Sequence, residues 1–133
     1  MKELSSYISE KLDLNDVSLS NSRAGSDNPD DFKEGDILVS IFNQSMTLVN
    51  FYKIIKKIGS KTFLLQGVYD KVVSGNKMKG ECIPDITNML NEEPKKFMVS
   101  RKDGKLRGGK SIDCYKAMYI YDDKPIAFDL IGG

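Results

Sequence analysis

Bases and glycines predominate between positions 101 and 110, and this segment is the best candidate for binding chemistry. It is called the basic loop here, and it holds three glycines, one acid and five bases: Arg101, Lys102, Lys105, Arg107 and Lys110. Positive charge spread along a flexible backbone can bind phosphates and release their counterions. The basic loop is therefore a candidate nucleic-acid contact. The alternative is a solvated hairpin tip whose lysines only keep it soluble.

A second group of lysines flanks the predicted turn at residues 59–60 and consists of Lys53, Lys56, Lys57 and Lys61. If this turn and the basic loop share one edge of the fold, together they would form a groove for a nucleic-acid backbone. Lys56 and Lys57 therefore join the five bases of the basic loop as predicted nucleic-acid contacts.

Three tyrosines recur at alternate or nearly alternate positions late in the chain: Tyr115, Tyr119 and Tyr121. In a strand this spacing places them on one face, where they could stack on bases or form a protein-binding surface. The alternative is that they pack in the core or at the rim of a barrel.

The sequence excludes much ordinary enzyme chemistry because it contains no histidine. Imidazole bases and histidine metal ligands are absent, and Cys82 and Cys114 cannot complete a tetrahedral zinc site by themselves. We expect these thiols to be core residues, with a disulfide as the alternative. The adjacent Asp122 and Asp123 indicate a turn, since neighbouring side chains in a strand point to opposite faces. We therefore expect no metal, no cofactor and no catalytic residues.

The elements that must position these residues fit in one domain, since the chain has 133 residues and 40% of them are hydrophobic. Residues 1–34 are predicted to be an amphipathic helix followed by a flexible acidic arm. The apolar positions of the helix have i, i+3, i+4 and i+8 spacing: Leu4, Tyr7, Ile8 and Leu12. This helix would dock either on its own domain or on a partner. Residues 15–33 are rich in Ser, Asn, Asp and Gly and are predicted to be a poorly ordered linker.

Residues 35–133 are predicted to form a small β-barrel-like domain. Runs rich in β-branched and aromatic residues predict strands at 37–42, 48–58, 61–68, 96–100, 111–121 and 126–131. Residues 84–94, bracketed by prolines, predict a single helical turn or a loop. The predicted fold class is mainly β: a small bent sheet or partly open SH3-like barrel, with a short N-terminal helix and an acidic linker.

Two stretches resemble a family of small uncharacterised proteins of phages and conjugative elements. The family's first motif reads G-D-x-x-V-S-S-W-G-Y-D-Q-T-N-V-D-F-Y, and its second resembles S-Y-A-Y-x-W-D-G-K-P. Positions 35–52 and 114–125 align with these motifs. The matching residues are Gly35, Asp36, Val39, Ser40, Thr47, Phe51, Tyr52, Asp122, Lys124 and Pro125. The resemblance covers roughly residues 35–131 and implies a mobile-element origin and a shared fold.

The central polar run departs from the family pattern. Tyr-Asp-Gln is replaced by Gln44, Ser45 and Met46, and the family's Asn is replaced by Leu48. A site that relatives build from that run would therefore be lost or changed in this chain.

From these patterns we expect a non-enzymatic macromolecule-binding module of a phage or mobile element. Its predicted partner is another protein of host or phage, in the manner of a counter-defence inhibitor or a virion or assembly component. The predicted contacts are Leu4, Tyr7, Ile8, Leu12, Tyr115, Tyr119 and Tyr121. The alternative is a nucleic-acid-binding domain that uses the basic loop. The longest apolar runs are too short to cross a bilayer, so we expect no membrane partner and a location in the host cytoplasm or on a virion.

Overall fold

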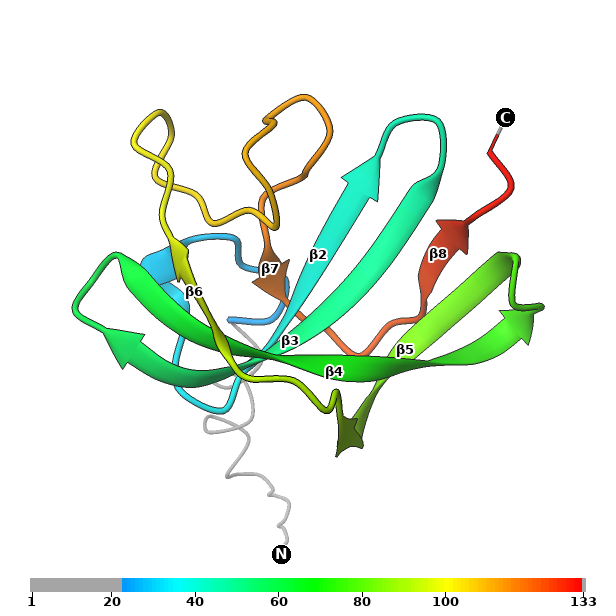
Figure 1. The fold of residues 1–133 in the computed structure, drawn as a ribbon, viewed down its shortest axis with the longest axis horizontal. Coiled ribbons are helices and arrows are strands. Elements are labelled where there is room, and N and C mark those ends of the chain that lie inside the picture. The colour runs from blue at the N-terminus through cyan, green and yellow to red at the C-terminus, as the bar shows by residue number, and fades with distance from the viewer. Residues whose placement is uncertain (1–22, 133) are drawn as a thin grey trace, which may run out of the picture.

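Residues 23–132, which the computed structural model describes, fold mainly as β-strands (Figure 1). The predicted amphipathic helix of Leu4, Tyr7, Ile8 and Leu12 lies outside the described residues. The elements in chain order are the 3-10 turn η1 (Pro29–Asp31), β2 (Ile37–Asn43), β3 (Thr47–Ile58), β4 (Thr62–Gly75), β5 (Lys79–Met89), β6 (Lys95–Met98), β7 (Tyr119–Ile120) and β8 (Ile126–Asp129).

Two hairpins begin the sheet. β2 pairs antiparallel with β3 from Ile37↔Lys53 to Asn43↔Thr47, and β3 pairs antiparallel with β4 down to Ile58↔Thr62. Gly59 makes the second turn possible, because its φ of 67° lies in the left-handed region that side chains disfavour. Residues 48–58 also match helical spacing, but their β-branched and aromatic composition correctly predicted a strand.

β4 is shared by several partners, and this sharing closes the barrel. Its first half pairs with β3 on one side and β6 on the other, while its second half pairs with β5. β5 then pairs with β8, and β8 meets β3 at Thr47↔Asp129. Strands β3, β4, β5 and β8 therefore form a closed four-stranded barrel, to which β2, β6 and β7 are added. The prediction of a mainly β fold with a small, strongly bent barrel is confirmed.

The shared sheet has a hydrophobic cluster on each face. Leu38 and Val39 of β2 are adjacent and therefore point to opposite faces, and each is completely buried in a different cluster. The first core cluster contains Phe32, Leu38, Ile54, Phe63, Leu65, Leu106, Met118 and Ile120. The second core cluster, inside the closed barrel, contains Val39, Phe51, Val68, Cys82 and Phe128. Burial on both faces explains why the β2 sequence is a nearly continuous apolar run.

Two local predictions were wrong. Residues 84–94 were predicted to form a helical turn or a loop, but β5 continues through Pro84 to Met89. Pro84 lies opposite Asp70, beside a register shift in β4, and an irregular ladder tolerates a residue that lacks an N–H. Of the strand predicted at 111–121, only Tyr119–Ile120 forms, because the chain turns earlier, where Tyr115 N–H donates to Ser111 O.

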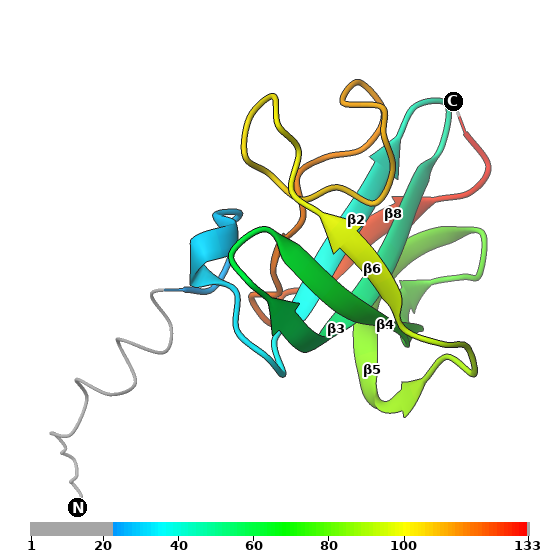
Figure 2. The ribbon, with the colours of Figure 1, turned by 60° about the vertical axis from the view of Figure 1, so that its left-hand side comes forward.

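Residues 23–34 were predicted to belong to a flexible arm, but the structure packs them against the barrel (Figure 2). Phe32 is only 1% exposed and joins the first core cluster, where its ring meets that of Phe63 edge-on at 5.7 Å. Arg23 forms an ion pair with Asp36 at 2.6 Å. The polar composition of this segment therefore reflects hydrogen bonding within a folded loop, including the Asn28 side chain that caps η1.

Candidate binding site

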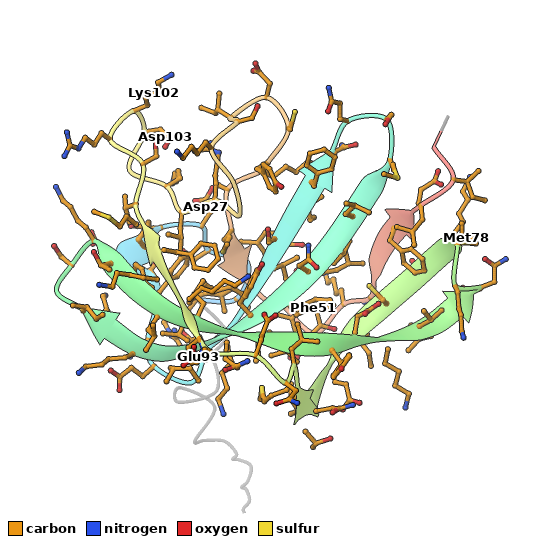
Figure 3. The ribbon with its side chains drawn as sticks, viewed as in Figure 1. Asp27, Phe51, Met78, Glu93, Lys102 and Asp103 are labelled. Carbon is orange, nitrogen blue, oxygen red and sulfur yellow. The ribbon has the colours of Figure 1, made fainter. Side chains whose placement is uncertain are left out.

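A cavity of about 460 Å³ lies between β6 and the basic loop, and it is called the cationic cavity here. Five cationic side chains and no acidic ones line it: Lys96, Lys102, Lys105, Arg107 and Lys110. Figure 3 labels Lys102 near the tip of the loop that follows β6, on the same side of the molecule as the loop that leads to β7. The cationic cavity is therefore an electrostatic site for an anion or an acidic segment.

The cavity also offers apolar surface. Phe97 and Met98 of β6 and Ile112 of the following loop line it together with the bases. Met98 is 67% exposed and Ile112 is 46% exposed, whereas the Phe97 ring packs against Tyr52 with 5.3 Å between ring centroids. The site thus combines accessible aliphatic side chains with a fixed aromatic ring.

The basic loop is anchored in the core through Leu106, while residues 101–104 at its tip are exposed. Leu106 is completely buried in the first core cluster, and its carbonyl accepts the Met118 N–H at 2.7 Å. Ser100 N–H donates to Lys105 O, and Gly104 N–H donates to Ser100 O. The bases are therefore held at defined positions around Leu106.

Two of the five predicted bases are already paired. Arg107 binds Asp103 through both carboxylate oxygens and donates Nε–H to Tyr115 O at 3.0 Å. The hydrogen bond between them raises the pKa of Arg107 and lowers that of Asp103. Lys105 lies 2.8 Å from Asp27. These pairs hold the loop in shape and reduce its net charge.

The remaining lysines of the cavity are open to a ligand. Lys96, Lys102 and Lys110 are exposed, and within residues 23–132 no carboxylate lies within ion-pairing distance of them. Arg101 is exposed as well but does not line the cavity. Sequence reasoning missed Lys96 and its apolar neighbours as site residues, although the short run after Pro94 carries two lysines beside the basic loop.

The second group of lysines does not join the cationic cavity. Lys57 has a structural role instead, since its Nζ donates to Phe32 O at 3.2 Å and lies 5.6 Å from the centre of the Phe63 ring. Lys56 is exposed on β3 but does not line the cavity. The groove expected between the two basic segments is therefore not built by these residues.

The three tyrosines are partly buried by packing within the domain. Tyr115 meets Phe42 edge-on at 5.0 Å, and Tyr121 meets Phe51 at 5.8 Å. Tyr119 and Tyr121 pack against the second core cluster, and burial raises the pKa of both phenols. Their positions favour the barrel-packing alternative over an open stacking face.

The two terminal edges of the sheet differ in how they are covered. At the β7 edge, Ile120 O accepts from Gly25 N–H at 2.7 Å and Ile120 N–H donates to Ser26 O at 2.9 Å. β6, at the opposite end of the strand order, pairs with β4 alone, and its other edge borders the cationic cavity. The cavity therefore lies at the one terminal strand edge that no described segment pairs with.

Other chemistry is limited in the part of the chain that the structure describes. Burial raises the pKa of Cys82 to about 11, so its thiol stays protonated at neutral pH. No three metal-ligating side chains gather among residues 23–132, and no helix there has the length and apolarity to cross a membrane. Comparisons with protein-family models, curated proteins and solved structures gave no match. The function must therefore be argued from the site itself.

Proposed function

We propose that the protein is a non-enzymatic binding module of a phage or mobile element, and that it holds an acidic segment of another protein in the cationic cavity. Such a module acts by occupying its partner's surface, as a counter-defence inhibitor or a virion assembly component does. One observation carries the proposal: five cationic side chains and no acidic ones line a cavity that also contains Phe97, Met98 and Ile112.

The mixture of side chains fits a protein segment. Lysines attract carboxylates at long range and set specificity, while a desolvated apolar centre supplies most of the affinity. Lys96, Lys102 and Lys110 can serve the first purpose, and Met98 and Ile112 the second.

Nucleic acid is the second candidate, because lysines open to solvent also bind phosphates. Two observations weigh against it. Lys105 and Arg107 already have acidic partners, and the tyrosine rings that could stack on bases pack within the domain. Phosphate binding would then depend on few cations and lack an aromatic platform.

The test measures fluorescence anisotropy of the full chain with labelled acidic peptides and with labelled single- and double-stranded DNA over a salt series. The variant Lys96→Ala/Lys102→Ala/Lys110→Ala should weaken peptide binding by about tenfold or more, since each ligand-facing charge contributes to association. The matched control Lys33→Ala/Lys71→Ala/Lys77→Ala removes three exposed lysines that do not line the cavity and should bind like wild type.

The possible results separate the candidates. Peptide binding that depends on the cavity lysines supports the proposal. DNA binding that falls steeply with salt, without peptide binding, would replace it with the nucleic-acid function. Binding of neither probe at low salt would overturn both.

A further inference from the structure

We infer that the acidic partner segment binds as an extended strand along the free edge of β6, and that its carboxylates reach the lysines of the cationic cavity. This inference rests on the proposed function and adds the conformation and sequence pattern of the ligand. The binding mode is strand addition, in which main-chain hydrogen bonds supply affinity and side-chain contacts supply specificity.

The register of β6 shows which backbone groups are available. β6 pairs with β4 from Thr62↔Met98 to Leu65↔Lys95, and Val99 N–H donates to Lys61 O just beyond the strand. The backbone groups of successive residues in an antiparallel strand face opposite edges. Val99 and Phe97 therefore face β4, and the N–H and C=O of Lys96 and Met98 face the cavity.

These outward groups have no hydrogen-bond partner among the backbone groups of residues 23–132. The next outward group along the chain, Ser100 N–H, is bonded to Lys105 O. The free edge thus ends where the basic loop begins. A short extended segment would meet Met98 and Lys96 in turn and continue the sheet by one strand.

The side chains around this edge define the ligand's sequence pattern. A strand edge with unpaired backbone groups can pair unspecifically with strands of other chains, and lysines or prolines on the edge commonly prevent this. Pro94, Lys95 and Lys96 give β6 this protection, and the same positive charge selects acidic segments. Because side chains alternate along a strand, acids at every second position can lie on the face of β6 that carries Lys96, while the intervening apolar residues lie on the opposite face, with Phe97. The ligand class is therefore an extended peptide with alternating acidic and apolar residues.

A pair of peptides tests the inference on the full chain. The first is a labelled short peptide of alternating Glu and Val, and the second is the same peptide with N-methyl groups at alternate residues. N-methylation removes backbone donors without changing charge or side chains. We expect the methylated peptide to bind about tenfold or more weakly, because strand addition depends on main-chain hydrogen bonds.

Two measurements on the protein complement the peptides. Amide exchange by NMR should slow at Lys96 and Met98 when the unmethylated peptide binds. The variant Met98→Pro removes one outward N–H and should weaken binding of the same peptide, provided that its thermal melt matches wild type. If this variant does not fold, the exchange measurement and the methylated peptide still test whether the ligand binds by strand addition.

The outcomes distinguish this inference from the proposed function. Weak binding of the methylated peptide, with slowed exchange at Lys96 and Met98, supports strand addition. Equal binding of both peptides with unchanged exchange would overturn strand addition and leave the acidic-segment function intact. Binding of neither peptide would overturn both.

Discussion

Arg107 holds Asp103 by two parallel contacts, 3.0 Å from Nη1 to Oδ1 and 2.7 Å from Nη2 to Oδ2. The two residues flank buried Leu106 and define the turn of the basic loop. Bidentate geometry fixes orientation as well as distance, which a lysine could not do in the same place. The conformation of the basic loop therefore depends on an internal acid.

This pair predicts a pH dependence of stability. The pKa of Asp103 is lowered in the folded state below its ordinary value of 3.8, mainly by the hydrogen bond from Arg107. The stabilisation is thus fully present above that value and is lost as the pH falls through the folded pKa. Thermal melts between about pH 6 and pH 3 should show a larger loss for wild type than for Asp103→Asn.

Asp113→Asn is the matched control for this prediction, because Asp113 is an exposed acid of the neighbouring loop whose carboxylate makes no ion pair within residues 23–132. It should follow the wild-type profile. If Asp103→Asn also follows that profile, the ion pair does not contribute to stability.

The burial of Phe32 predicts a large contribution of this residue to the free energy of unfolding. Phe32→Ala should lower the free energy of unfolding by about 3–5 kcal/mol, since a fully buried aromatic leaves a cavity when it is truncated. Urea denaturation measures the change. Ile131→Ala, at a residue that is 66% exposed, is the control and should have little effect. A small effect of Phe32→Ala would mean that residues 23–34 are not bound to the barrel in solution.

Gln66 is predicted to fix the segment that leads into β6. Its buried Nε2 donates to Leu90 O and Glu92 O, both at 2.9 Å. Gln66→Glu keeps the shape but removes both donors, so it should cost about 1–3 kcal/mol or more at neutral pH. Chemical denaturation compares it with Gln44→Glu in the exposed β2–β3 turn. Similar stabilities for the two variants would contradict the role of Gln66.

The two cysteines should differ in reactivity. Cys82 is buried and its pKa is raised to about 11, whereas Cys114 is only partly buried. A thiol reagent at neutral pH should therefore label the native protein at Cys114 first and label Cys82 only after unfolding, because the thiolate is the reactive form. Mass spectrometry of peptides locates the label. Native Cys114→Ser should stay unlabelled, and rapid labelling of Cys82 would show that the barrel interior opens.

Local composition predicted the strands that lie in uninterrupted apolar runs, such as β2 after Gly35 and the β3–β4 hairpin around Gly59. It could not predict whether single apolar residues in polar surroundings are buried or exposed. Phe32 and Leu106 each stand alone among charged and small residues, yet both are buried in the first core cluster. Their burial depends on contacts between segments far apart in the chain, and local patterns carry no signal for such contacts.

The candidate site was predicted only in part, because some of its residues come together through contacts between segments far apart in the chain. The basic loop was recognised from its composition, and four of its five bases line the cavity. Lys96 and Met98 were missed because they matter only once β6 pairs with β4 and leaves one edge open. The tyrosine spacing indicated a common strand face, whereas the turn at Ser111 takes Tyr115 out of the short β7 strand.

The closure of the barrel at Thr47↔Asp129 has a consequence for synthesis. β8 pairs with β3 and β5, which precede it by many residues, so the second core cluster lacks Phe128 until β8 is available. On the ribosome, Val39, Phe51 and Val68 lack the part of their cluster that Phe128 supplies until residues 126–129 have emerged. Contacts so distant in sequence also slow folding. An incomplete chain therefore exposes apolar surface that the finished barrel covers, and such surface favours aggregation.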